Sequence, residues 1–348
     1  MNNVRVFAAN ESGDYRALIS RYALDLDVYY RMDLLAAEAA RQQAQAEIFT
    51  LESGTGLFIY PYLKRPLPAP FELYFDIISP YGYAGPYASD DATFAEGEEC
   101  LLDHLTRKNT VSEFVRYHFL FNASRRFTQR IENSKNRTIV LLNTTAPWNR
   151  IWDEQFSKTN RNMVRKVEKA GFEIQFGFDA DLLDEFMRHY SSTMARVNAD
   201  ESFIFPVDFY LRLSEGLGQD FFIARAIRGT DVAGTAMFLR SGSFLTYYLS
   251  ARNPDYPEIP ATNFILSKVA QWATDRRIEH FNIGGGLSDD AGDALFRFKR
   301  NFSQETAEFH VGKRIHNPDI YSQIREHWIR QHGLLAFEKR AHLLQFYR

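Results

Sequence analysis

The spacing of apolar and polar residues predicts a mixed α/β domain in the first half of the chain. Apolar residues recur at helical intervals between Asp14 and Gln45, which predicts one or two helices. Short apolar runs then flank the segment Ser53-Gly54-Thr55-Gly56, and this combination predicts a β-hairpin. The other elements expected here are strands at 71–78, 115–120 and 137–142 and a helix at 96–108.

The pattern after residue 147 predicts a second α/β unit with a similar order of elements. It begins with a helical segment at 147–171 whose basic residues fall largely on one face, namely Lys158, Arg161, Arg165, Lys166 and Lys169. Such a face either binds a phosphorylated partner or is simply solvated. Strands are then expected at 172–176, 221–227, 232–240, 244–251 and 280–283, and helices at 181–196, 206–215 and 262–276. The repeated order suggests a tandem duplication.

These elements divide the chain into three parts. We expect one domain at 1–146, a second at 147–316 and a helical tail at 317–348. The tail is basic and amphipathic, which fits a helix that packs back on the body of the protein. Contact of the same helix with a membrane surface is the alternative.

Composition and charge narrow the classes of partner and compartment. The chain has 348 residues, long enough for two domains, and a net charge of −3. This charge argues against a protein whose main task is to grip nucleic acid over a broad surface, and no DNA partner is expected. With Cys100 as the single cysteine, an intramolecular disulfide or a CxxC pair is excluded. No signal-peptide pattern opens the chain and no apolar run is long enough to span a membrane, so we expect a cytoplasmic protein.

The segment 281–299 has the residue types expected of a site for an anionic ligand. The apolar run at 281–283 ends in Gly284, Gly285 and Gly286, and Lys299 follows a short distance on. Glycines let backbone N–H groups approach a phosphate or carbonyl closely, and a lysine supplies the counter-charge. The alternative is a flexible turn at the end of a strand.

Six segments resemble, in order, those of the Fem-type family within the superfamily of Gcn5-related N-acetyltransferase (GNAT) folds. They extend over residues 75–302 and lie at 75–86, 113–118, 157–166, 193–200, 281–286 and 298–302. The resemblance implies tandem GNAT-like domains, an α/β (α+β) fold with mixed, mostly antiparallel sheets flanked by helices. Family members often have proline after the histidine of the second segment, whereas this chain has Phe119.

The resemblance also implies an activity. Fem-type enzymes transfer an acyl or aminoacyl group to an amine, usually on a nucleotide- or lipid-linked muropeptide or amino sugar at the inner face of the membrane. Arg116 and Tyr117 would lie near the acceptor, and Arg161 and Arg165 near a phosphate. Lys299 would lie beside the reacting carbonyl or an acceptor phosphate. The competing hypothesis is an inactive protein of the same fold that binds envelope precursors or carbohydrate.

The donor is expected to be a co-substrate, either aminoacyl-tRNA or acyl-CoA, with no tightly bound cofactor. Related acetyltransferases hold the pyrophosphate of coenzyme A on a glycine-rich turn before the helix that starts here near Thr262 and Asn263. In this chain the corresponding connection, 252–261, has three prolines and no glycine. A prolyl nitrogen donates no hydrogen bond, which disfavours coenzyme A bound in the usual way. No heptad run long enough for a tRNA-gripping arm is present.

The expected chemistry is attack of a neutral amine on a thioester or ester carbonyl. Backbone N–H groups near 249–251 or at 284–286 could hold the oxyanion. The candidates for the general base are Asp76, Asp200 and Glu201, although Asp76 also fits a structural cap. Cys100 has acidic neighbours that should raise its pKa.

Other side chains complete the prediction. Tyr81 and Tyr83 lie in the aromatic loop 79–86, which either stacks sugar rings or packs as an Ω-loop. Asn263, at the start of the helix at 262–276, is a further candidate for substrate binding. The histidines lack metal-ligand spacing, and no metal site is expected.

Overall fold

The computed structural model describes residues 3–54, 56–121, 123, 131–196 and 203–348. The chain forms two compact units, each assembled from separate stretches of sequence. Unit 1 comprises 1–24, 29–136 and 309–348, and unit 2 comprises 25–28 and 137–308. The predicted boundaries at 146/147 and 316/317 stay a prediction, because a compact unit need not coincide with a folding domain.

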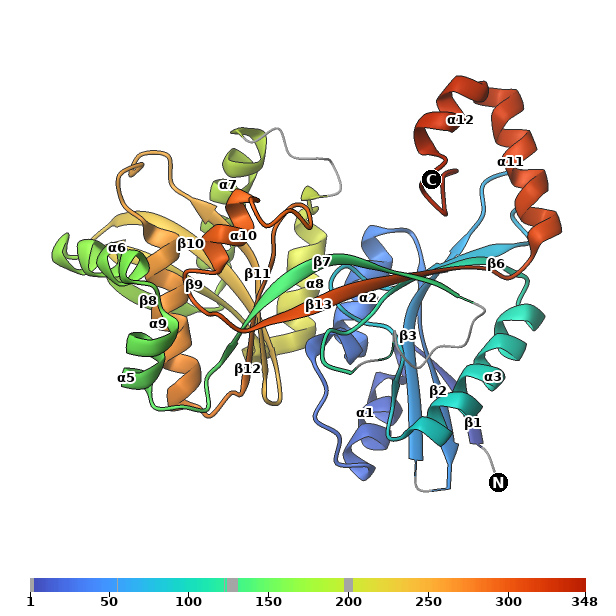
Figure 1. Ribbon diagram of the computed structural model, residues 1–348, viewed down its shortest axis with the longest axis horizontal. Helices are drawn as coiled ribbons and strands as arrows, with labels where there is room; N and C mark the ends of the chain where they lie inside the picture. The colour runs from blue at the N-terminus through green and yellow to red at the C-terminus, as the bar shows by residue number, and fades with distance from the viewer. Residues whose placement is uncertain (1–2, 55, 122, 124–130, 197–202) are drawn as a thin grey trace. The chain divides into compact units, whose positions relative to one another are not determined.

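Unit 1 contains a mixed sheet with helices on both faces (Figure 1). Its strands are β1 (Asn3–Ala8), β2 (Gln45–Ser53), β3 (Gly56–Pro66), β4 (Phe75–Ile78), β5 (Tyr87–Ala88), β6 (Thr110–Arg116) and β13 (Thr306–Ile315). The helices are α1 (Ser12–Arg21), α2 (Met32–Arg41), α3 (Asp91–Arg107), α11 (Pro318–His332) and α12 (Leu334–Arg340). The strand order is β1-β2-β3-β4-β6-β13, and only the β4–β6 pair is parallel. Helix α3 covers one face through Phe94, Leu101 and Leu105.

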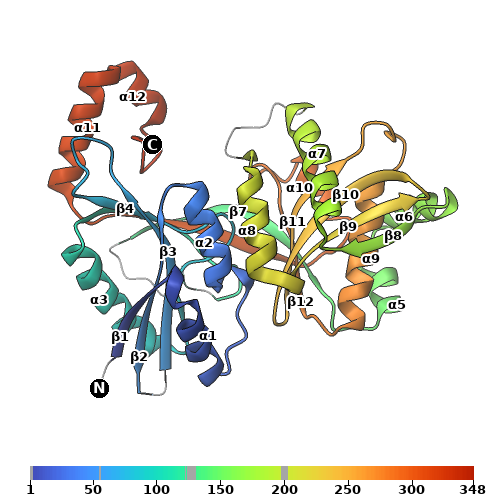
Figure 2. The same cartoon turned by 180° about the vertical axis from the view of Figure 1, so that it is seen from behind.

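Unit 2 repeats this architecture with different residues. Its strands are β7 (Glu132–Asn143), β8 (Glu173–Gly177), β9 (Phe221–Arg228), β10 (Asp231–Ser241), β11 (Phe244–Arg252) and β12 (His280–Gly285). Its helices are α5 (Trp148–Arg150), α6 (Lys158–Lys169), α7 (Ala180–Arg196), α8 (Val207–Leu217), α9 (Ala261–Asp275) and α10 (Ala294–Lys299). The strand order is β7-β12-β11-β10-β9-β8, with β11 and β12 parallel. Helix α9 covers one face, and α7 and α8 cover the other (Figures 1 and 2).

The order of elements along the chain confirms the suspected duplication at the level of structure. Each unit has a strand, two helices, three antiparallel strands, a helix and a parallel strand. In unit 1 this series is β1, α1, α2, β2, β3, β4, α3 and β6, and in unit 2 it is β8, α7, α8, β9, β10, β11, α9 and β12. The last strand of each series pairs with a strand that is not its own continuation in the chain. β13 follows β12 in sequence but pairs with β6, whereas β7 follows β6 in sequence and pairs with β12.

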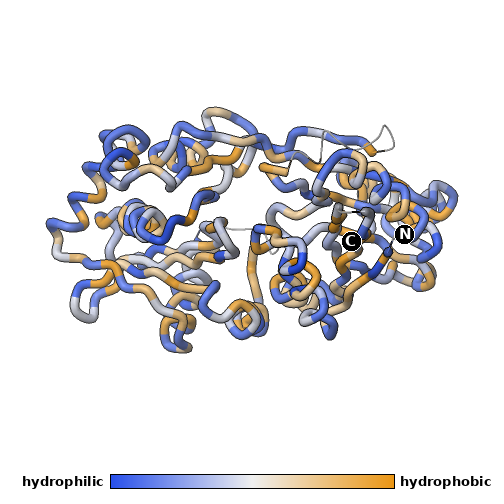
Figure 3. Tube along the Cα trace, turned by 90° about the horizontal axis from the view of Figure 1, so that it is seen from below, coloured by the Kyte–Doolittle hydropathy of each residue, from blue (hydrophilic) through white to orange (hydrophobic). Residues whose placement is uncertain are grey.

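The C-terminal helices belong to unit 1. A separate apolar cluster joins Leu67, just after β3, and Val111 of β6 to Ile324 of α11 and to Phe346 and Tyr347. Burial of these side chains removes apolar surface from water and holds the tail in place. Hydrophilic and hydrophobic stretches alternate along the chain (Figure 3).

Candidate active site

Gly284 and Gly285 end β12, and together with Gly286 they pack this part of the chain tightly against its surroundings. Gly284 has φ +83°, a conformation that favours glycine. A Cβ on Gly285 would lie 2.8 Å from the carbonyl oxygen of Thr138, and Arg137 donates a 2.7 Å hydrogen bond to the carbonyl of Gly286. The loop is therefore held against β7 by steric fit and hydrogen bonding.

The backbone N–H groups that follow the glycines already donate hydrogen bonds to a carboxylate of the protein itself. Asp293 accepts hydrogen bonds from the backbone N–H groups of Leu287 and Ser288, at 3.0 and 3.3 Å. Its other oxygen caps α10 by accepting from Phe296 N at 2.8 Å. Binding of an external anion by the glycine loop stays a prediction, and the contacts give the loop a second task, which is to position α10.

Lys299, the last residue of α10, is buried on the α9 side of the unit 2 sheet. Its Nζ lies 5.6 Å from the ring centroid of Tyr247 on β11, a cation–π contact. Burial, assisted by the charge of Arg137, lowers the pKa of Lys299 to about 8. No carboxylate among the described residues forms an ion pair with it. The Lys299 ammonium is therefore poorly solvated, and it loses its proton at a lower pH than an exposed lysine does.

The strand beside Lys299 carries an irregularity with chemical consequences. Met237 pairs with Leu249 and Phe238 with Tyr247, which leaves Tyr248 as a β-bulge. Moreover, β11 and β12 pair only as far as Thr246↔Asn282 and separate beyond that point. A bulge at the mouth of two diverging strands frees backbone polar groups from the ladder. One of the two backbone segments predicted to hold an oxyanion, 249–251, directly follows this bulge, and its role there stays a prediction.

Substitution of Gly286 by alanine tests whether the tight loop matters. The added Cβ would lie 2.5 Å from Oδ1 of Asp293 and 3.0 Å from Cβ of Phe296. We expect overpacking to lower the free energy of unfolding by about 1–3 kcal/mol in urea titrations. Gly13→Ala on α1 is the control, since a Cβ added there would have no heavy atom within 4 Å. Equal unfolding midpoints for the two variants would contradict the tight fit.

Helix α6 uses several of its basic side chains internally. Arg161 donates to the carbonyl oxygens of Trp152 and Asp153 at 3.1 and 3.0 Å. Arg165 lies 5.6 Å from the ring of Trp152, and Lys166 donates to the carbonyl of Glu258 at 2.7 Å. Phosphate binding by Arg161 and Arg165 stays a prediction, and both residues already have structural partners.

Asn263 takes part in a polar cluster near the end of α10. Its Nδ2 donates to Oδ1 of Asn160 on α6 at 2.8 Å, and Asn160 donates to the carbonyl of Asn301 at 3.3 Å. Ser157 also bonds to the Asn301 side chain, at 2.7 Å. These bonds tie the start of α9 and α6 to the segment that follows Lys299.

The connection 252–261 uses most of its N–H groups internally. Backbone N–H groups of Asn253, Tyr256 and Ile259 donate to carbonyls at 3.1–3.2 Å, and Asp255 N donates to the Asn253 side chain at 3.0 Å. Ala261 N donates to the carbonyl of Ile259 at 2.8 Å. The connection therefore offers few donors for a pyrophosphate.

In unit 1, Arg116 keeps part of its guanidinium available. Its Nη1 donates to the carbonyl of Ser79 at 2.9 Å, and its backbone N donates to the Ser79 hydroxyl at 2.9 Å. Burial lowers the pKa of Arg116 to about 10, although nearby Glu38 and Tyr81 oppose the change. No ion pair joins Arg116 to a carboxylate within the described ranges. A largely buried cation without a counter-ion is suited to an anionic ligand.

The predicted aromatic residues of unit 1 have mainly packing contacts. Tyr117 is buried, and its hydroxyl donates to Asn133 at 2.6 Å. Tyr83 makes edge-to-face contacts with Tyr29, Phe119 and Phe309 at centroid distances of 5.7, 5.3 and 4.9 Å. These contacts agree with a packed loop, and the sugar-stacking roles of Tyr81 and Tyr83 stay predictions.

Asp76 is fully buried in β4 rather than at the start of a loop. Its carboxylate accepts from Nε of Arg65 at 2.7 Å and from Nε of Arg348 at 2.9 Å. Two guanidinium partners leave the carboxylate little freedom to take a proton from a substrate. A structural role is the simpler interpretation, while the other proposed bases, Asp200 and Glu201, lie outside the described residues.

Sequence reasoning missed the buried polar network of unit 1. Glu113 on β6 meets Arg314 on β13 at 3.5 Å and His316 at 2.9 Å. Burial alone would raise the pKa of Glu113, but the His316 hydrogen bond and the Arg314 charge outweigh it and lower the pKa. The partners lie about two hundred positions apart, so only the alternation of Phe309 and Val311 with polar residues could have revealed β13.

The predicted shift in the pKa of Cys100 can be compared with the structure. The pKa of Cys100 is raised by burial and by the charges of Glu96, Glu99 and Asp103, as expected. Across the part of the chain that the structure describes, no three His, Cys, Asp or Glu side chains gather in a way that could hold a metal ion.

Comparison with known proteins identifies the fold. Residues 154–300 match the family model described as acetyltransferase (GNAT) domain. The crystal structure of FemX has a TM-score of 0.70 at 12% identity, covering 92% of this chain and 99% of that one. The C-terminal domain of a putative lysylphosphatidylglycerol synthetase from Agrobacterium fabrum has a TM-score of 0.58 at 13% identity, covering 94% and 98%. The fold is thus a tandem GNAT-like α/β fold.

A relative of known activity is similar to part of this chain. The UDP-N-acetylmuramoylpentapeptide-lysine N(6)-alanyltransferase of Weissella viridescens is 24% identical over 173 residues, 48% of this chain. The match spans about half of that relative, 49% of its length. Together with the FemX fold and the GNAT match, it confirms the resemblance seen in the sequence. The chain therefore shares the fold of FemX and is similar to this alanyltransferase over about half of its length.

Proposed function

We propose that the protein transfers an aminoacyl group from an ester donor to an amine of a peptidoglycan precursor. The observation that carries the proposal is Lys299, a buried cation with a lowered pKa, next to the bulge at Tyr248. This arrangement suits stabilisation of an oxyanion. The relative from Weissella viridescens is named for such a transfer to a lysine side chain.

The proposed step conserves atoms and electrons. The nitrogen of the neutral acceptor amine attacks the ester carbonyl carbon, and a C–N bond forms as the carbonyl oxygen becomes an oxyanion. The bulged backbone of β11 and the Lys299 ammonium hold that oxyanion. The C–O bond to the donor then breaks, and the leaving oxygen takes up the proton that the amine loses.

An aminoacyl-tRNA donor is favoured over acyl-CoA. The N–H groups that would meet a coenzyme A pyrophosphate are engaged within 252–261 or replaced by proline nitrogens. The remaining phosphate-binding candidates are exposed basic residues of α6, such as Lys158 and Lys169, which suit the backbone of a nucleic acid.

The acceptor is proposed to be a phosphorylated precursor held by unit 1. Arg116 supports this, because its largely buried guanidinium lacks a carboxylate partner among the described residues. A phosphate or carboxylate of the precursor could accept from its remaining N–H groups.

Peripheral membrane contact is proposed through the turn between α11 and α12. Leu334 and Leu335 are 57% and 76% exposed at the start of α12, and Arg330, Lys339 and Arg340 flank them. Exposed leucines beside basic residues suit the surface of an anionic bilayer. In the described part of the chain, no helix is long and apolar enough to span a membrane. Such contact would place a cytoplasmic enzyme beside lipid-linked acceptors.

The test is a transfer assay with matched donors. Purified protein is incubated with UDP-N-acetylmuramoylpentapeptide and either alanyl-tRNA or acetyl-CoA, and products are identified by mass spectrometry. We expect alanylated precursor with the first donor and no acetylated product with the second. Acetylation would overturn the choice of donor. If neither donor is consumed while the precursor binds, the inactive binding protein becomes the better explanation.

A further inference from the structure

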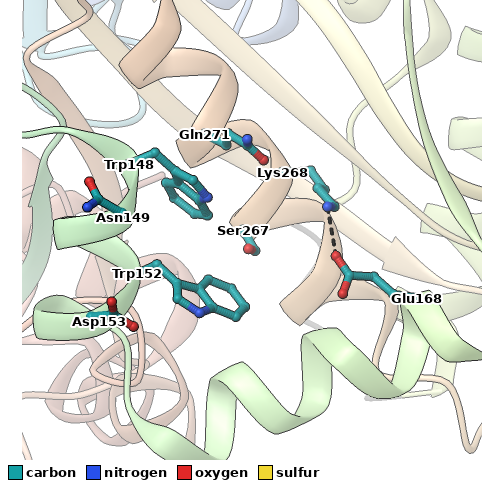
Figure 4. A pocket seen from close by; sticks show the side chains of 8 residues that line it. All are labelled: Trp148, Asn149, Trp152, Asp153, Glu168, Ser267, Lys268 and Gln271. Carbon is teal, nitrogen blue, oxygen red and sulfur yellow. Dashed lines mark hydrogen bonds and ion pairs between the residues drawn. The ribbon is translucent and has the colours of Figure 1, made fainter.

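A pocket on the surface of unit 2 has features that the transfer reaction does not use. It has a volume of about 320 Å³ and lies between α5, the turn after it, α6 and α9. Trp148 and Trp152 face the same space, with Ser267 of α9 between them (Figure 4). Their ring centroids are 5.7 Å apart at an interplanar angle of 48°.

The two tryptophans are held in place by their surroundings. Both pack on Phe156, at centroid distances of 5.7 and 5.6 Å. Trp152 lies on a π-helical turn, Ile151–Gln155, a rare conformation that often occurs at functional sites. Arg161 donates to the carbonyls of Trp152 and Asp153 and so supports this turn. The aromatic surface is therefore preorganised, which lowers the entropic cost of binding.

Polar side chains line the pocket beside the tryptophans. Ser267 is 1% exposed and lines the pocket. Side chains of Asn149, Asp153 and Gln271, which also line the pocket, make no hydrogen bond within the described ranges. Hydroxyl, amide and carboxylate groups that line a pocket can pair with the hydroxyls of a ligand.

The charges around the pocket select against an anion. Among the described residues that line the pocket, the one cation is Lys268, which forms a 2.8 Å ion pair with Glu168. Asp153 also lines the pocket, and its carboxylate has no such partner. A phosphate or nucleic-acid backbone would meet net negative charge here. An uncharged ligand with many hydroxyl groups and an apolar face fits both the aromatic walls and the mixed donors and acceptors.

We propose that this pocket binds a neutral pyranose sugar. The apolar face of the ring packs on Trp152 or Trp148, and its hydroxyls pair with Ser267, Gln271 and Asn149. The proposal does not rest on the transfer reaction, because none of these residues belongs to the Lys299 site.

Calorimetric titration with chitotriose and maltotriose, two uncharged saccharides, tests the proposal. We expect the protein to bind at least one of them with a change in tryptophan fluorescence. Gln271→Ala, on the half-exposed side of α9, should weaken binding about tenfold, about 1.4 kcal/mol. Trp152→Ala should weaken it at least as much, with circular dichroism confirming that the variant is folded.

The matched control is Gln323→Ala, an exposed glutamine on α11 that should leave binding unchanged. Failure of both saccharides to bind at millimolar concentration would overturn the proposal. So would binding that survives both Gln271→Ala and Trp152→Ala. Binding of choline in place of the saccharides would assign the aromatic walls to a cation and also overturn it.

Discussion

Replacement of Lys299 by methionine is expected to lower the rate of aminoacyl transfer while making the protein more stable. Methionine keeps most of the length and volume of lysine but removes the ammonium over the Tyr247 ring. Loss of one group that stabilises an oxyanion typically reduces kcat by roughly a hundred- to a thousandfold. A fall in kcat with little change in the KM for the acceptor would place the ammonium at the reacting carbonyl.

The gain in stability follows from the lowered pKa. The unfolded chain binds a proton at Lys299 with the ordinary pKa near 10.5, whereas the folded protein binds it with a pKa of about 8. Folding with a charged Lys299 therefore costs up to about 3 kcal/mol, at about 1.4 kcal/mol per pKa unit. Below pH 8 the full cost is present, and it disappears as pH rises from about 8 toward 10.5. The advantage of Lys299→Met in urea unfolding should shrink over that interval.

Lys108→Met is the matched control for both measurements. Lys108 is exposed at the end of α3, so its replacement should change neither the transfer rate nor the pH dependence of unfolding between pH 8 and 10.5. A Lys299→Met protein that is less stable than the wild type near neutral pH would mean that the ammonium has favourable partners in the folded state. Unchanged transfer would remove Lys299 from the proposed mechanism.

Much of the fold could be predicted because its strands and helices bury one face each. The hairpin of β2 and β3 and the series from β8 to β12 appear in the sequence as alternating or continuous apolar runs. The strands β1 and β13 were missed, since each is exposed along part of its length and has a weaker pattern. The exchange of β7 and β13 depends on pairing between distant segments, which local spacing does not encode.

The sequence predicted some residues of the site but not their contacts, because local spacing does not show which distant segments meet. Lys299 and the glycines at the end of β12 lie close together in the sequence, so a single segment showed both the motif and its surroundings. The partners that decide how a side chain can act are distant: Arg137 lies well before Lys299, and the bulge at Tyr248 depends on the register with β10. Asp76 is a further example, because its partner Arg348 is 272 positions away.

Replacement of Asp76 by asparagine is expected to destabilise unit 1 without changing the chemistry. The substitution leaves the guanidinium of Arg65, whose side chain is only 11% exposed, without its carboxylate. Removal of one partner from a buried ion pair typically costs about 3–5 kcal/mol. We expect a loss near the lower end of that range in urea unfolding, because the asparagine oxygen can still accept one hydrogen bond.

The transfer rate then distinguishes the two roles of Asp76. If the carboxylate is structural, Asp76→Asn should keep the wild-type kcat per folded molecule at a temperature well below unfolding. Asp103→Asn is the control, since Asp103 forms an exposed pair with Arg107 and should shift stability by less than about 0.5 kcal/mol. A fall in kcat of roughly a hundredfold in folded Asp76→Asn protein, without the expected loss of stability, would instead make Asp76 the general base. The burial of Asp76 between Arg65 and Arg348 favours the first result.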